Sequence, residues 1–485
     1  MSEIYLIIIG IILSFPYICE LYFSLCVFSW RPSNQPSNES SNNEEPFVSI
    51  LVPAYREPPE VLIDTLRSLR EQNYKNYEVL VLINNTPEPE LWLPVKNYCE
   101  RIGKPFKFIY LERINGYKAG VLNEAEKYID PKTEIIGIVD SDYIVDRNFI
   151  KKAIDHFSTS EVGVVQFPQD YRNVNDDLFS QAMYYSYRYF FATIMKFSDL
   201  IGATSFMGTV GFIRRRALID VGGWDEKILT EDSEIGLRIN AKGYKCIYID
   251  QSIGKGLMPL DFKSCKTQRY RWSYGNMQTI LKHFKLLLLS KKLPIKKKLA
   301  FITQNTVWHN PLLIVITLGY LSLVIPKLGI LCLTLGSMYL FSKTLIFLSI
   351  FKKVDNLSFY KAFISYLFYL SLFVPMSIAP MKALIGVKSS FKRTPKCYNH
   401  LINSKDFEEL IIGGLIVILI ILSLKKGCFY TFLSALISSF YVLSYVGLHI
   451  LSILDHIRKL RIDQSNRGSR YENWDNLVAM EKSAS

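Results

Sequence analysis

Residues Val48–Ile83 read VSILVPAYREPPEVLIDTLRSLREQNYKNYEVLVLI, and this stretch indicates the class of fold. It opens with an apolar run closed by a proline, Val48–Pro53, which predicts a strand. Apolar residues then recur at helical spacing near Pro59–Gln72, which predicts an amphipathic helix. A second apolar run, Tyr77–Ile83, predicts another strand. A strand, a helix and a strand in this order are typical of a parallel βαβ unit.

The alternation continues beyond this unit, with further apolar runs at Phe106–Leu111 and Ile135–Val139. We therefore expect a mostly parallel, doubly wound α/β sheet. Polar residues follow three of the predicted strands, at Tyr55-Arg56-Glu57, Asn84-Asn85 and Asp140-Ser141-Asp142. Because such sheets bind ligands at the carboxyl ends of their strands, these residues should gather at one site. No GxGxxG follows a strand and no GxxxxGK[ST] occurs. The sequence therefore lacks the main motif that would indicate a dinucleotide oxidoreductase or a P-loop NTPase.

Composition separates a globular part, Phe47 to about Phe284, from apolar flanks in this 485-residue chain. With 49% hydrophobic and 21% charged residues, the chain has enough apolar surface to exclude disorder. The eight cysteines form no CxxC pair, so neither a zinc site nor a disulfide framework is indicated. Several apolar runs reach about the 20 residues that a membrane-spanning helix needs, which argues against a purely soluble protein. The runs are Ile4–Phe28 and, after the globular part, about 305–325, 328–351, 358–387, 409–424 and 428–454.

Basic residues beside the predicted membrane segments explain the net charge of +13, so we expect no nucleic-acid partner. Basic residues gather beside the apolar runs, most densely in Lys282–Lys298, as the positive-inside rule describes. We expect a multi-pass protein of the plasma membrane, with its N-terminus outside and its globular part and C-terminus in the cytoplasm. The run at 358–387 contains Pro375, Pro380 and Lys382, so we expect an in-plane or re-entrant helix there. This gives five crossings, and six or seven remain as alternatives.

Two acidic motifs are candidates for chemistry. Asp140 and Asp142 follow a predicted buried strand, and two such carboxylates can converge on one Mg²⁺ or Mn²⁺ that bridges a diphosphate. A triplet of this kind is more often a solvated loop. Thr230-Glu231-Asp232 precedes a helical stretch, Ser233–Ala241, and can serve as a helix cap. A carboxylate there can also act as a general base toward a sugar hydroxyl.

A third motif, Gln268-Arg269-Tyr270-Arg271-Trp272, combines an amide, two guanidinium groups and an indole. Arginines bind diphosphates through forked donors, and a tryptophan face suits a sugar ring. On its own the motif fits slightly better a basic helix that lies against lipid headgroups.

Together these motifs resemble the membrane-embedded processive synthases of glycosyltransferase family 2, which include cellulose, chitin, hyaluronan and β-glucan synthases. The resemblance covers most of the chain, and its last motif resembles a cytoplasmic gating loop. Its motifs are PAYRE (Pro53–Glu57), YKAGVLN (Tyr117–Asn123), DSD (Asp140–Asp142), VVQFPQ (Val164–Gln169), FMGTVGFIRR (Phe206–Arg215), GGWDEKILTEDSEIGLR (Gly222–Arg238), QRYRW (Gln268–Trp272) and FKRTPK (Phe391–Lys396).

The resemblance implies a GT-A-type, Rossmann-like catalytic domain inserted between transmembrane helices, and it implies a role for each matching residue. Asp232 would be the catalytic base, while Asp140 and Asp142 would bind Mg²⁺ or Mn²⁺. The donor would be bound by Ala54, Tyr55, Glu57, Asn84, Asn85, Lys118, Asp140, Gln268, Arg269, Arg271, Thr394 and Lys396. The acceptor would be bound by Phe206, Met207, Gly208, Thr209, Glu231 and Trp272.

The implied domains follow the same order along the chain. They are a transmembrane helix at 1–30, a linker at 31–46, the cytoplasmic catalytic domain at 47–260, the QRYRW motif with interfacial helices at 261–304, a transmembrane hairpin with the interfacial or re-entrant helix at 305–387, the gating-loop-like segment at 388–408, a second hairpin at 409–456 and a cytoplasmic tail at 457–485.

The implied activity is inverting, processive transfer of a sugar, with UDP-glucose as the donor, to a β-linked polysaccharide that the transmembrane helices could translocate. Two departures from the family pattern leave the donor base and the acceptor open: Asn84-Asn85 replace acidic residues, and Met207 replaces a cysteine. One alternative is a glycolipid synthase with a membrane-lipid acceptor. The other is a non-catalytic membrane scaffold.

Overall fold

The computed structural model describes residues 45–174, 177–308 and 329–389, together with a few isolated positions in the flanks. The predicted N-terminal span, the gating-loop-like segment with Thr394 and Lys396, and the last two apolar runs lie outside the described residues. The fold below is that of the globular part and the helices packed against it.

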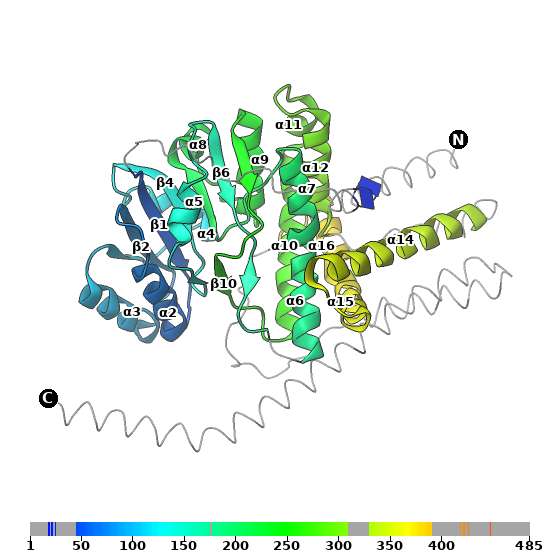
Figure 1. The fold of residues 1–485 in the computed structure, drawn as a ribbon, viewed down its shortest axis with the longest axis horizontal. Helices are drawn as coiled ribbons and strands as arrows, with labels where there is room; N and C mark the ends of the chain where they lie inside the picture. Colours follow the sequence, from blue (N-terminus) through cyan, green and yellow to red (C-terminus); the bar gives the residue numbers. More distant parts are fainter. Residues whose placement is uncertain are drawn as a thin grey trace, which may run out of the picture.

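Seven strands form the main sheet, in the order β3-β2-β1-β4-β8-β6-β9 (Figure 1). Neighbouring strands are parallel except that β8 runs antiparallel to both β4 and β6, which confirms the prediction of a mostly parallel α/β sheet. All eight residues of β2 are buried, which explains why its sequence is a continuous apolar run. The strands are β1 (Phe47–Ala54), β2 (Tyr77–Asn84), β3 (Phe106–Leu111), β4 (Thr133–Ile138), β6 (Val162–Gln166), β8 (Gly211–Arg214) and β9 (Lys245–Tyr248).

Helices cover both faces of this sheet. On one face, α2 buries Leu62, Leu66 and Leu69 at helical spacing in a core shared with α3, α5 and β1. On the other face, α4, α8 and α9 contribute a second core. The doubly wound arrangement therefore follows from amphipathic helices between buried strands. These helices are α2 (Pro59–Arg70), α3 (Pro89–Ile102), α4 (Tyr117–Ala125), α5 (Phe149–Ile154), α8 (Arg215–Asp220) and α9 (Glu231–Lys242).

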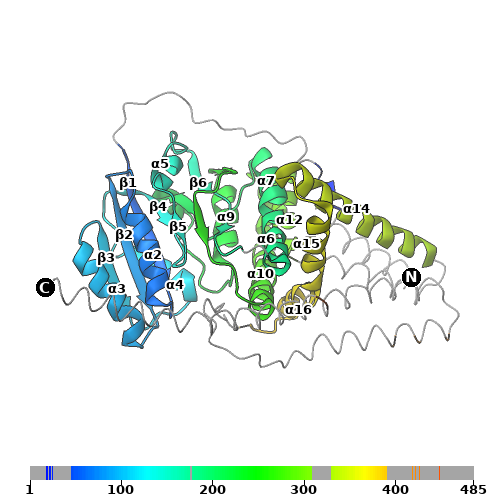
Figure 2. The same ribbon diagram turned by 60° about the horizontal axis from the view of Figure 1, so that its bottom comes forward.

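A bundle of helices stands beside the β9 end of the sheet (Figures 1 and 2). Its long helix α10 carries the QRYRW motif and packs against α16 and α12, while α15 packs against α6. A small sheet of β5 (Ile144–Val145), β10 (Gly254–Gly256) and β7 (Asp170–Tyr171) lies at the junction. The bundle contains α6 (Leu178–Phe190), the π-helix η2 (Phe191–Met195), α7 (Lys196–Leu200), α10 (Phe262–Lys282), α11 (Phe284–Leu289), α12 (Ile295–Thr306), α14 (Gly329–Asp355), α15 (Phe359–Ser371) and α16 (Phe373–Leu384).

One stretch within the described ranges, Phe359–Leu384, is long and apolar enough to cross a membrane, with a mean hydropathy of 1.8. It corresponds to α15 and α16, which break at Leu372. Because 72% of its most apolar window is buried inside the protein, the core helix of a soluble protein would meet the same criterion. The multi-pass topology therefore stays a prediction.

Candidate active site

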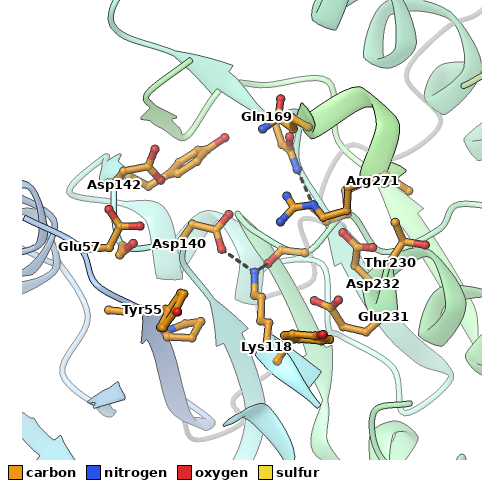
Figure 3. Close-up of a pocket in the computed structure, with 18 of the residues that line it drawn as sticks. Tyr55, Glu57, Lys118, Asp140, Asp142, Gln169, Thr230, Glu231, Asp232 and Arg271 are labelled. Atoms are coloured by element: carbon orange, nitrogen blue, oxygen red, sulfur yellow. Dashed lines mark hydrogen bonds and ion pairs between the residues drawn. The ribbon is translucent and has the colours of Figure 1, made fainter. Parts of the chain in front are cut away.

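The carboxyl ends of β1, β2 and β4 open into a cavity of about 340 Å³, which the start of α9 and one side of α10 close (Figure 3). Segments that are far apart in the sequence meet here, as expected for the strand ends of a doubly wound sheet. The predicted site residues that line the cavity are Ala54, Tyr55, Glu57, Asn84, Asn85, Lys118, Asp140, Asp142, Met207, Gly208, Glu231, Asp232, Gln268, Arg271 and Trp272.

Lys118 and Asp140 form an ion pair in the cavity. The Lys118 ammonium donates to the Asp140 carboxylate at 2.5 Å and to the Gly208 carbonyl at 2.8 Å (Figure 3). The backbone N–H of Asp140 donates to the Thr209 hydroxyl at 2.9 Å, which fixes the loop after β4. Burial disfavours the charged ammonium, but the Asp140 and Glu231 carboxylates outweigh it and raise the pKa of Lys118. Lys118 therefore stays protonated and can neutralise a diphosphate.

Asp140 and Asp142 are the residues suited to hold a divalent cation. Asp142 is held in place, because its carboxylate accepts from the Leu257 N–H at 3.0 Å and its carbonyl accepts from Arg172. Within the described ranges, no group of three or more His, Cys, Asp or Glu side chains could hold a metal. Two carboxylates fit a Mg²⁺ or Mn²⁺ that takes its remaining oxygen ligands from a diphosphate and water. The donor set therefore suits an ion that binds together with a nucleotide.

Glu231 and Asp232 form the first turn of α9, two residues earlier than the helix predicted from the sequence. The Thr230 side chain makes no capping hydrogen bond, whereas the Asp232 carboxylate accepts from the Ser233 N–H at 2.8 Å. Burial and the neighbouring Asp232 charge raise the pKa of Glu231 to about 7, and burial also raises the pKa of Asp232. Lys118 and Arg271 oppose both shifts. A carboxylate with a raised pKa is a stronger proton acceptor.

These raised pKa values predict a pH dependence of sugar transfer. A raised pKa means that a carboxyl keeps its proton to higher pH, and Asp232 can accept a proton only in its ionised form. We therefore expect kcat to rise as the pH increases from about 5 to 8. Initial rates across this range provide the measurement. Glu231→Gln should keep the rising limb, because burial, the main cause that raises the pKa of Asp232, is unchanged by this substitution. A rate that stays constant over the whole range would contradict the prediction.

Helix α10 supplies the opposite wall of the cavity. Gln268, Arg271 and Trp272 line it, and the Gln268 side-chain oxygen accepts from the Tyr187 hydroxyl. A buried hydrogen bond of 2.9 Å from Ser233 to Asn276 ties α10 to the first turn of α9. The arginine and the acidic pair are therefore held on two connected helices.

Of the predicted residues that the structure describes, three do not line this cavity. Arg269 is 1% exposed and lies among aromatic rings. Positions two apart on a helix point to nearly opposite sides, so Arg269 points away from the cavity that Arg271 faces. Phe206 is fully buried and packs on Trp224, with ring centroids 5.7 Å apart. Thr209 supports Asp140 through its hydroxyl. The sequence predicted that these three side chains contact the donor or the acceptor, whereas the structure places them outside the cavity.

Several cavity residues were not assigned from the sequence. Tyr117 and Gln169 belong to the YKAGVLN and VVQFPQ motifs, so these motifs could have indicated that both residues lie at the site. Gln169 donates to the Met207 carbonyl at 2.7 Å, and Gln166 accepts from the Met207 N–H at 2.8 Å, so both glutamines hold the loop that carries Gly208. The other unassigned lining residues are Pro53, Ser141, Tyr143, Tyr171, Leu229, Thr230 and Leu257, and no pattern in the sequence marked Leu257.

Comparison with known proteins identifies the family of this chain. The family model described as glycosyl transferase family group 2 matches residues 135–378, about half of the chain. The chain belongs to this family. It is a glycosyltransferase, and the match spans the loop with Asp140, the acidic pair on α9 and the QRYRW helix.

The relatives of this glycosyltransferase include plant enzymes. Glucomannan 4-beta-mannosyltransferase 1 of Oryza sativa subsp. japonica is 27% identical over 302 residues, which are 61% of this chain and 57% of that protein. Glucomannan 4-beta-mannosyltransferase 1 of Cyamopsis tetragonoloba is 26% identical over 264 residues, 53% of this chain and 50% of that protein. The glycosyltransferase thus spans about half the length of these relatives.

A solved structure shares the fold. Mannosyltransferase PcManGT from Pyrobaculum calidifontis, in complex with GDP-Man and Mn²⁺, superposes with a TM-score of 0.53 at 17% sequence identity. The match covers 80% of this chain and 100% of that protein. It supports the GT-A-type fold of the catalytic domain.

Proposed function

We propose that this glycosyltransferase transfers mannose, with inversion, from a nucleotide diphosphate sugar to a β-linked polysaccharide. The observation that carries the proposal is the meeting of Asp232 with Lys118, Asp140 and Arg271 in one cavity. Mannose replaces the glucose of the sequence-based expectation, because the curated relatives are named as mannosyltransferases and the solved neighbour contains GDP-Man. GDP-mannose is therefore the first candidate donor.

In this mechanism, Asp232 accepts the proton of the acceptor hydroxyl while that oxygen attacks the anomeric carbon. The bond to the nucleoside diphosphate breaks on the opposite side, and a single displacement inverts the anomeric configuration. Lys118 and Arg271 stabilise the negative charge that develops on the leaving diphosphate. A divalent ion held by Asp140 and Asp142 would supply additional charge neutralisation there.

The base-binding end of the cavity is compatible with a purine or a pyrimidine. The Asn85 amide is engaged with the backbone of Ile114, donating to its carbonyl and accepting from its N–H at 2.8 Å each. Asn84 lines the cavity beside it. An amide offers both a donor and an acceptor, so Asn84 can pair with the edge of either base, whereas an acidic side chain offers acceptors alone.

The acceptor side favours a glycan chain over a single lipid headgroup. A second, narrower cavity of about 50 Å³ shares Met207, Asp232 and Trp272 with the first and extends between α6, α10 and the end of α12. Aromatic rings and amides line it, a combination suited to the apolar faces and hydroxyls of sugar rings. A glycolipid synthase remains the alternative acceptor class.

A donor panel tests this proposal. The full chain, purified in detergent with Mn²⁺ or Mg²⁺, is given GDP-mannose, GDP-glucose, UDP-glucose and UDP-N-acetylglucosamine in turn. We expect the fastest transfer from GDP-mannose and products that lengthen with time. Preference for UDP-glucose would contradict the mannose proposal, and one labelled sugar per lipid would support the glycolipid alternative. The absence of transfer and hydrolysis with every donor would overturn the catalytic proposal.

A further inference from the structure

Arg269 lies in a buried aromatic cage. Its guanidinium carbon is 3.9 Å from the ring centroid of Tyr187, 5.1 Å from that of Trp272 and 5.2 Å from that of Trp308. One terminal nitrogen donates to the Ser186 hydroxyl at 3.1 Å, whereas Nε and Nη1 have no oxygen or nitrogen partner among the described residues. Besides the Ser186 hydroxyl and the Cys265 sulfur, the three rings surround this desolvated guanidinium and stabilise it by cation–π attraction.

The cage connects three separate segments of the helix bundle. Tyr187 belongs to α6, Trp272 to α10, and Trp308 follows the end of α12; these helices lie side by side in Figures 1 and 2. The two indoles also contact each other edge to face, with centroids 4.9 Å apart. The Arg269 guanidinium is the cation around which these three rings pack.

The same three rings form part of the wall of the second cavity, and Trp272 lines both cavities. Arg269 lines neither of them. Its neighbour Arg271 lines the donor cavity, where its charge lowers the pKa of Glu231 and Asp232. The two arginines of QRYRW therefore have different surroundings, one polar and one aromatic.

We infer that Arg269 is a positioning residue that orients Trp272 and Trp308 for binding of the acceptor glycan. This inference rests on the proposed function. The guanidinium holds the indole planes through its positive charge, so that sugar rings meet preformed aromatic surfaces and little ordering is needed on binding. Donor binding does not depend on it.

Binding of β-(1→4)-mannohexaose to the full chain, followed by intrinsic tryptophan fluorescence, tests the inference. We expect Arg269→Met to weaken this binding about tenfold, as loss of a buried cation–π cluster predicts, and Arg269→Lys to recover much of it. Binding of GDP with Mn²⁺ should stay within about twofold of the wild type in both variants, whereas Arg271→Met should weaken it. Arg101→Met is the matched control, because it removes a cation 5.4 Å from the Tyr98 ring on the remote helix α3.

The outcomes separate the inference from the proposed function. Unchanged mannohexaose binding in Arg269→Met, or an equal weakening of mannohexaose and GDP binding, would overturn it. So would a wild-type protein that does not bind mannohexaose at all. If Arg269→Met does not fold, Trp308→Leu replaces it, since it removes a cage ring outside the donor cavity and should weaken the same binding. Failure of the donor panel, by contrast, would appear as absent transfer and hydrolysis in the wild type.

Discussion

Asp232→Asn is expected to lower kcat for sugar transfer by about 1,000-fold, within the range known for loss of a general base. The asparagine keeps the size of the side chain and can still accept from the Ser233 N–H, so the first turn of α9 should hold its geometry. It cannot take a proton from the acceptor hydroxyl. Initial transfer rates, together with calorimetric binding of GDP and Mn²⁺, provide the measurement.

The matched control for this prediction is Glu231→Gln. It changes the neighbouring carboxyl of the same helical turn and the same cavity by the same chemistry. Because Glu231 is not assigned the proton transfer, we expect it to retain far more activity than Asp232→Asn. Normal turnover in Asp232→Asn would remove Asp232 from the mechanism, and a larger loss in Glu231→Gln would transfer the role of base to Glu231.

Much of the fold was predictable because its signals are local. Buried parallel strands such as β2 have to be apolar at every position, and α2 has to repeat apolar residues at helical spacing to cover the sheet. The site was predictable for a related reason, since polar residues that directly follow buried strands end at one edge of the sheet. Asp140, which comes after β4, is the clearest example.

The remaining features depend on packing between distant segments. The order of residues in QRYRW does not reveal which arginine faces the donor, because that depends on how α10 is rotated against α9 and α6. Trp308 follows α12 and carries no motif, yet it meets Arg269 and Trp272 in space. Leu257 reaches the site through its backbone N–H, which any residue except proline could supply.

Gly208→Ala is expected to lower kcat by at least about 100-fold, the typical cost of displacing a catalytic group by 1 Å. A Cβ at this position would lie 2.6 Å from the Asp232 carboxylate oxygen, too close for any real contact. The backbone of Gly208 also has φ +79°, and its carbonyl accepts from Lys118. Relief of the clash would therefore move either the proposed base or the carbonyl that holds the Lys118 ammonium.

Gly222→Ala provides the control that separates the clash from backbone strain. Gly222 has nearly the same φ, +81°, but a Cβ there would meet nothing within 4 Å. Both alanine variants should lose about 1 kcal/mol of stability from the left-handed backbone, which thermal unfolding measures. Transfer rates should fall in Gly208→Ala and stay near the wild type in Gly222→Ala. Equal activity in the two variants would contradict the close approach of Gly208 to Asp232, because strain alone would then account for both.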